Sequence, residues 1–297
     1  MTTGAGGPGA HPLRRALPLF VLAGFCLSSL DATAKSLVRD HALLLIVWAR
    51  YAGQMLVVTP FAWHQAGPGF WRTRRLGLHL LRSSFLVAAT MCFFGGLKWL
   101  PLAEGSAITF LAPIVVVLLA GPLLGERPTR ARWAAAIAGF SGVLLLVRPG
   151  GAVFHPAALL LLGAAVTNGL YQLYTRLLAA EDPSTLLFYS ALVGTVALTL
   201  PLPWLVDLST LAPRDLGLLV LLGLLAGLGH WFMINAYQRA PASLLTPFTY
   251  LQMLWATAYG YLVFGQLPDG VSFVGMAVIV ASGVGLALHE RRRHARA

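Results

Sequence analysis

Ten stretches of mostly apolar residues divide this chain, with short polar segments between them. They lie at 17–37, 42–62, 77–97, 104–124, 131–147, 157–177, 185–206, 216–237, 242–264 and 270–288. A helix of about 20 apolar residues spans the hydrocarbon core of a bilayer, so each stretch predicts one transmembrane helix. Charged residues make up 10% of the chain, whereas soluble proteins contain about 25%. The sequence therefore predicts an all-α integral membrane protein, whose 297 residues leave no room for a soluble domain.

The basic residues indicate how the spans are oriented. The formal net charge of +11 also occurs in nucleic-acid-binding proteins, but here the arginines cluster in short segments between apolar runs. Most of them fall on the side that holds both ends of the chain, which the positive-inside rule assigns to the cytoplasm. We therefore expect the lipid bilayer and no nucleic acid as partner, with cytoplasmic tails at 1–16 and 289–297. Arg14, Arg15 and the apolar run after them also fit a signal peptide, but the internal repeat of the sequence requires the first span.

Two halves of the sequence match each other. The segment from Pro101 to Pro128 recurs as Pro241 to Pro268. Matching positions include Thr109/Thr249, Phe110/Tyr250 and Gly125/Gly265, and the first spans of the halves align at Asp31/Asn168 and Lys35/Gln172. Each half holds five spans, so the second half must enter the membrane from the opposite face. The chain is thus predicted to form two inverted five-helix repeats around a central cavity, at 17–148 and 157–288, joined by an outer loop at 149–156.

Three charged residues lie inside the first two predicted spans. Asp31 and Lys35 lie one turn apart on the same helix face, and Arg50 enters the second span to a similar depth. A charge near the bilayer centre costs about 2.5–3.5 kcal/mol, so we expect these three to line a wet cavity and to bind a substrate carboxylate. The alternative is that Asp31 only neutralises the two cations. Asn168 and Gln172 of the matching span would add uncharged hydrogen bonds to the substrate.

Aromatic side chains offer apolar surface for the same cavity. Phe110 and Tyr250 occupy matching positions of the two repeats, and Tyr171 lies in the sixth span. An apolar pocket with a few polar anchors is the usual site for a small molecule, so all three are predicted to bind the substrate. The alternative is that they belong to the aromatic belt at the membrane interface. Arg82, near the inner end of the third span, is predicted to reach the headgroups as an interfacial anchor.

Short motifs occur at the end of the third span and through the fourth and fifth spans. They are Leu100-Pro101-Leu102-Ala103-Glu104, Pro113 within the fourth span, Leu124-Gly125-Glu126-Arg127-Pro128, and Gly139-Phe140-Ser141-Gly142. Together with the five-plus-five spans, they resemble the EamA-type transporters of the drug/metabolite transporter superfamily. The resemblance implies ten helices in a bacterial inner membrane and transport of small organic metabolites, often amino acids or drugs and frequently outward. The second repeat departs from the pattern, because it has Gly265-Gln266-Leu267-Pro268 where the first has an acid.

These observations predict a secondary transporter that exports an amino acid or a related compound by alternating access. The alternative is an importer of a vitamin or a nucleoside-like metabolite. An intramembrane enzyme is disfavoured, since the sequence has no Gly-x-Ser-x-Gly and no His-Glu-x-x-His motif, and a passive channel would share the polar pathway. Neither Cys26 nor Cys92 has metal-ligating company, so no metal and no cofactor is expected. A ten-helix carrier can act as a monomer, and the sequence leaves the oligomeric state open.

Overall fold

The computed structural model describes residues 10–125, 129–148, 155–206, 211–240 and 245–294. Helices make up most of these residues, and no strand occurs among them. The helices are α1 (Ala10–Leu37), α2 (Leu43–Ala66), α3 (Leu76–Leu97), α4 (Leu102–Thr109), α5 (Ala112–Leu124), α6 (Arg130–Val147), α7 (Ala158–Leu177), α8 (Pro183–Thr199), α9 (Leu202–Leu205), α10 (Pro213–Arg239), the 3₁₀ helix η2 (Thr246–Tyr250), α12 (Leu251–Phe264) and α13 (Gly270–His294).

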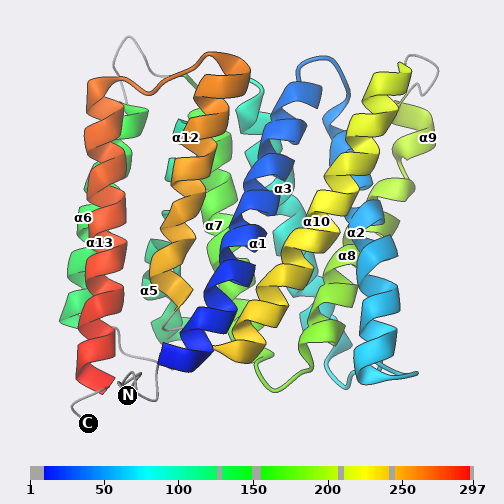
Figure 1. Ribbon diagram of the computed structural model, residues 1–297, viewed down its shortest axis with the longest axis horizontal. Coiled ribbons are helices and arrows are strands. Elements are labelled where there is room, and N and C mark those ends of the chain that lie inside the picture. The colour runs from blue at the N-terminus through cyan, green and yellow to red at the C-terminus, as the bar shows by residue number, and fades with distance from the viewer. Residues whose placement is uncertain (1–9, 126–128, 149–154, 207–210, 241–244, 295–297) are drawn as a thin grey trace, which may run out of the picture.

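The long helices stand side by side in one bundle (Figure 1). The start of α1 and the end of α13 lie at the same end of this bundle, which we call the terminal end. Because consecutive long helices run up and down, α2 starts at the opposite end and ends at the terminal end. Both ends of the described chain therefore lie on one side, as an even number of membrane crossings requires.

Seven helices in the described part of the chain are long and apolar enough to cross a membrane. They are Arg14–Leu37, Leu43–Ala66, Leu76–Leu97, Leu102–Leu123, Arg130–Val147, Pro213–Arg239 and Gly270–His289. The three other expected spans correspond to α7, α8 and the pair of η2 and α12. They are less distinct because α8 has 17 residues, α12 has 14 residues, and α7 contains Asn168 and Gln172. The protein is thus a multi-pass helical membrane protein.

The fourth span, expected at 104–124 with Pro113 as an interruption within it, is broken in the structure. Helix α4 ends at Thr109 and α5 begins at Ala112, so Phe110 and Leu111 form a turn between them. The proline at 113 explains the break, since its ring cannot donate the hydrogen bond that would continue the helix. In the second half, η2 contains Pro247 and precedes α12 in a similar way. Phe110 and Tyr250 therefore both lie at interruptions.

Pairs of helices pack in a regular pattern. Helix α1 lies along α10, and α3 lies along α7. Helix α2 packs against both α8 and α10, while α6 packs against α13. A large apolar core includes Ile46, Tyr51, Phe94 and Leu222, from α2, α3 and α10. This core fixes the position of the helices that carry the buried charges.

Candidate functional site

Asp31 and Arg50 are two opposite charges inside the bundle that interact without pairing. Asp31 of α1 is half-buried, and among the described residues its carboxylate makes no hydrogen bond and no ion pair within 4.0 Å. Arg50 of α2 is the charged group that acts on it electrostatically. Arginine and carboxylate groups that pair do so through short charge-assisted hydrogen bonds, which these two side chains do not form. The gap between these two side chains therefore leaves hydrogen-bonding capacity on both.

The Arg50 guanidinium is held on one side only. Its Nη1 donates to Thr90 Oγ1, and its Cζ lies 4.7 Å from the centroid of the Tyr51 ring. The Tyr51 hydroxyl lies 2.9 Å from the same Thr90 oxygen, so α2 and α3 together fix the plane of the guanidinium. The Arg50 Nε is buried and has no hydrogen-bond partner among the described residues. Arg50 is thus a positioned cation with unused donors.

Lys35 is turned away from Asp31. Its Nζ donates to the carbonyl oxygen of Leu97, at 3.0 Å, and to that of Leu100. Leu97 is the last residue of α3, where carbonyl groups lack helical partners, and Leu100 lies in the connection to α4. The ammonium also lies 5.4 Å from the centroid of the Phe264 ring. Asp31 and Arg50 therefore interact electrostatically without an ion pair, and Lys35 has separate partners at and just after the end of α3.

Phe110 and Tyr250 stack on each other. Their ring centroids are 5.0 Å apart and the rings are inclined by 24°. Both side chains are half-buried, and they come from the two interruptions at α4–α5 and η2–α12. The two matching repeat positions thus meet face to face, and both rings have part of their surface accessible.

The three site residues predicted on α7 have different surroundings. Tyr171 is half-buried, and its hydroxyl accepts a hydrogen bond from Arg82 Nη2 at 2.8 Å. Asn168 is half-buried and has no hydrogen bond among the described side chains, whereas Gln172 is exposed. These residues lie three and four positions apart and therefore share one face of α7, but neighbouring helices bury them to different degrees.

The prediction that Arg82 is an interfacial anchor is wrong. Its side chain is 2% exposed and does not reach the surface. Besides Tyr171, it donates to Thr175 Oγ1, to the carbonyl oxygen of Leu186 and to Ser190 Oγ. These partners belong to α7 and α8, so the depth of Arg82 along α3 did not determine its environment. Arg82 is a buried cation that joins helices of the two halves.

Gln54 is a polar residue that the sequence reading missed. It follows Arg50 by one helical turn on α2 and is 0% exposed. Neither its Oε1 nor its Nε2 has a hydrogen-bond partner among the described residues. Its position four residues after Arg50, on the same helix face, could have identified it from the sequence.

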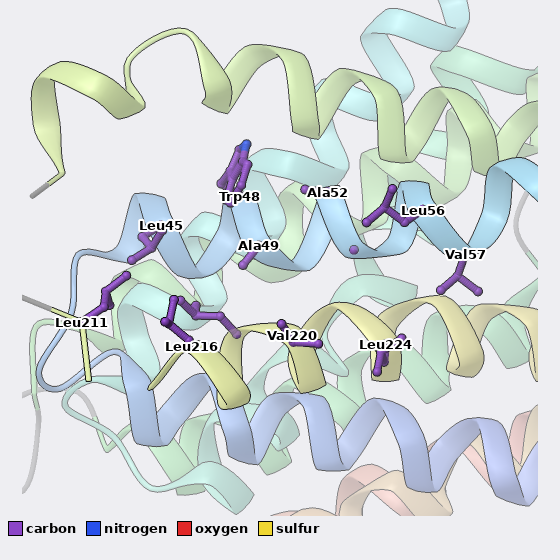
Figure 2. Close-up of a pocket in the computed structure, with 12 residues that line it drawn as sticks. Leu45, Trp48, Ala49, Ala52, Leu56, Val57, Leu211, Leu216, Val220 and Leu224 are labelled. Atoms are coloured by element: carbon purple, nitrogen blue, oxygen red, sulfur yellow. The ribbon is translucent and has the colours of Figure 1, made fainter. Parts of the chain in front are cut away.

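An apolar pocket between α2 and α10 is distinct from these polar groups. It has a volume of about 410 Å³ and includes Trp48, Leu56, Leu216 and Leu224 in its lining. Figure 2 shows Trp48 and Leu56 on α2 and Leu216 and Leu224 on α10. All twelve lining residues are apolar, and Asp31, Arg50 and Gln54 are not among them.

One exposed ion pair lies at the end of the bundle opposite to the terminal end. Arg148 Nη2, after α6, donates to both carboxylate oxygens of Asp269, before α13, at 2.5 and 2.6 Å. These hydrogen bonds hold the pKa of the Asp269 carboxyl well below its usual range. The pair fastens the start of α13 to the end of α6.

A multi-pass helical bundle with an unpaired acid and an unpaired arginine in its interior is typical of membrane transporters, since intramembrane charges mark substrate or ion pathways. The chain belongs to the EamA-like transporter family, whose model matches residues 14–148 and again residues 155–288. A solved crystal structure has the same fold, with a TM-score of 0.65 and 22% sequence identity over 96% of this chain and 99% of that one.

Similar curated proteins are named as transporters of different compounds. A riboflavin transporter of Vibrio cholerae is 29% identical over 96% of this chain and 97% of its own length. An S-adenosylmethionine uptake transporter of Rickettsia felis is 25% identical over 93% of this chain and 94% of its own. A pseudopaline exporter of Pseudomonas aeruginosa is 26% identical over 93% of this chain and 96% of its own.

Proposed function

We propose that this protein is a secondary transporter that moves a small organic metabolite across a bacterial inner membrane by alternating access. The observation that carries the proposal is the unpaired state of Asp31 and Arg50. A charge inside a membrane protein is costly unless it is paired or hydrated. Two opposite charges that interact electrostatically but form no ion pair with each other are therefore suited to a ligand that bonds to both.

The packing of the helices supports two inverted five-helix repeats with ten spans. Helix α1 begins the first half and lies along α10, the third long helix of the second half. Helix α7 begins the second half and lies along α3, the third helix of the first half. The family model also matches each half once. Such halves rock against each other around a site near the bilayer midplane, and both ends of the chain would then lie in the cytoplasm.

The first substrate class is an amino acid or a related zwitterion, with export as the direction. Its carboxylate would bond to the free donors of Arg50, and its ammonium group would bond to Asp31. Asn168 and Tyr171 would supply uncharged hydrogen bonds from α7, with Gln172 joining them when the cavity changes shape. Lys35 would add positive potential at a distance, since its ammonium already bonds to carbonyl groups.

A vitamin or nucleoside-like metabolite is the second candidate. The stacked pair of Phe110 and Tyr250 favours it, because aromatic faces bind planar rings. Riboflavin and S-adenosylmethionine, which name two of the relatives, both contain a planar heterocycle. In this case the ring of the substrate would replace one ring of the stack.

Counterflow into proteoliposomes tests the proposal. The panel contains labelled alanine, glutamine, asparagine, glutamate, riboflavin and S-adenosylmethionine. We expect saturable counterflow of at least one compound, and at least about a tenfold loss in Asp31→Asn and Arg50→Gln. Arg214→Gln is the matched control, because Arg214 is exposed at the start of α10. Full counterflow by both site variants would exclude the pair from the site, and flux without saturation would indicate a channel.

A further inference from the structure

The buried carboxamide of Gln54, in the middle of α2, forms no hydrogen bond with the described residues. Its side chain is 0% exposed, and neither atom of its carboxamide has a partner among the described residues. Most buried polar side-chain atoms in proteins are hydrogen-bonded, so a carboxamide with both ends unpaired is unusual. Burying such a group in a membrane protein is costly, because lipid offers no hydrogen bonds in compensation. A residue kept only for packing would be apolar.

Arg50 shows the same feature one turn away. Its Nε is also buried and unpaired, while the Nη1 of the same guanidinium is bonded to Thr90. Residues four apart lie on one face of a helix, so the unpaired donor of Arg50 and the carboxamide of Gln54 are neighbours on α2. Gln54 lies on the side of Arg50 that is nearer to the terminal end. The unpaired groups therefore extend the polar site from Arg50 towards that end.

The packing of α2 explains why these groups are closed off in this conformation. A methyl group on Gly194 of α8 would clash with the Tyr51 ring, so α8 packs directly on the face that carries Gln54. Helix α10 covers another side of α2, because Gly53 and Gly223 meet there. A carrier that rocks its halves separates such contacts during each cycle. The carboxamide becomes accessible when α2 and α8 move apart.

We propose that Gln54 is a specificity-determining residue that hydrogen-bonds the substrate together with the Nε of Arg50. This proposal rests on the proposed function and assigns a further part of the same site. A carboxamide offers one acceptor and two donors side by side. Its best complement is a substrate group that places an acceptor next to a donor, as carboxamides, lactams, imides and amidines do. Glutamine, asparagine, riboflavin and S-adenosylmethionine contain such a group, whereas alanine and glutamate do not.

The test compares Gln54→Leu with Thr59→Val. Thr59 is on the same helix and its buried hydroxyl is also unpaired, but it lies on another face. Both substitutions remove an unpaired polar group, so each should raise the unfolding temperature of the purified, substrate-free protein by about 2–4 °C. Only Gln54→Leu should also raise the KM for counterflow, by roughly tenfold, because the substrate then leaves its own polar group unpaired. Gln54→Asn should lie between the wild type and Gln54→Leu.

Each possible result supports or overturns the role proposed for Gln54. A lower unfolding temperature for Gln54→Leu overturns the proposal, because the carboxamide would then hold a structural bond. A higher unfolding temperature with an unchanged KM overturns it as well. Preference of the wild type for alanine or glutamate over every compound with an adjacent donor and acceptor overturns the substrate class. Failure of the wild type to transport any compound of the panel overturns the proposed function, whereas saturable transport by the wild type with an unchanged KM in Gln54→Leu overturns the assignment of Gln54 alone.

Discussion

Gly53 of α2 and Gly223 of α10 meet where these two helices cross, and this contact leads to a quantitative prediction. A Cβ on Gly223 would lie 2.7 Å from Gly53 Cα and 3.0 Å from the carbonyl oxygen of Ala49. A Cβ on Gly53 would clash in the same way with Gly223 Cα. Carbon atoms in ordinary contact are about 3.5–4.0 Å apart, so an added methyl group must push the helices apart by about 1 Å. The atoms that it meets belong to the backbone and cannot rotate away.

Gly217 on the same helix supplies the control, since a Cβ there meets nothing within 4 Å. Both Gly223→Ala and Gly217→Ala gain helix propensity, by up to about 1 kcal/mol. Only Gly223→Ala also suffers overpacking, which costs about 1–3 kcal/mol. We therefore expect Gly223→Ala to be about 1–3 kcal/mol less stable than Gly217→Ala, with Gly53→Ala at least as unstable as Gly223→Ala.

Equilibrium unfolding of the purified variants in detergent measures this difference directly. Counterflow should fall in Gly223→Ala as well, because α2 carries Arg50 three residues before Gly53 and moves with the crossing point. Equal stability of Gly223→Ala and Gly217→Ala would refute the reasoning, since it would mean that the two helices do not approach closely at these glycines.

Three other predictions concern side chains whose partners are defined. The hydrogen bonds from Arg148 lower the pKa of Asp269, so this pair contributes stability above the ordinary carboxyl pKa of about 4, and the contribution is lost as the pH falls towards the depressed pKa. Between about pH 6 and pH 3, the unfolding temperature of the wild type should therefore fall further than that of Asp269→Asn. Equal decreases would contradict the pairing. Arg82→Lys should lower the free energy of unfolding by roughly 2–4 kcal/mol, because one ammonium cannot reproduce the bonds of the guanidinium to α7 and α8; an unchanged unfolding curve would show that these bonds are dispensable. Tyr250→Leu removes a stacking contact of about 0.5–1.5 kcal/mol with Phe110 and should raise the KM for riboflavin more than that for alanine, whereas equal effects would argue against ring binding there.

The sequence was sufficient for the helical membrane fold, because apolar runs of the right length directly reflect the thickness of a bilayer. It was less informative where a span is short or interrupted. Phe110 and Leu111 are apolar, so hydropathy does not distinguish them from their neighbours, although they form the turn between α4 and α5. The proline at 113 was the only local signal of that break.

The candidate site was predictable in part. The shared depth of Asp31 and Arg50 follows from counting residues along their spans, and in the structure Arg50 acts on Asp31 electrostatically. The same count placed Lys35 with them, because a position on a helix face does not say how far a long side chain reaches. The Lys35 ammonium bonds instead to the carbonyl groups of Leu97, where α3 ends, and of Leu100 in the connection that follows. The sequence around Lys35 does not show that carbonyl groups of another helix need a hydrogen-bond donor.

Arg82 and Gln54 show why depth alone misleads for intramembrane polar residues. An arginine near the end of a span can reach the headgroups only if its side of the helix faces lipid. The side of α3 that carries Arg82 faces α7 and α8, which lie about a hundred residues away along the chain and supply all four of its hydrogen-bond partners. Gln54 presents the reverse case, since α8 and α10 close around it and offer no partner. Where neighbouring helices satisfy a buried polar group, it stabilises the bundle, and where they do not, the missing partner is expected to arrive with the substrate.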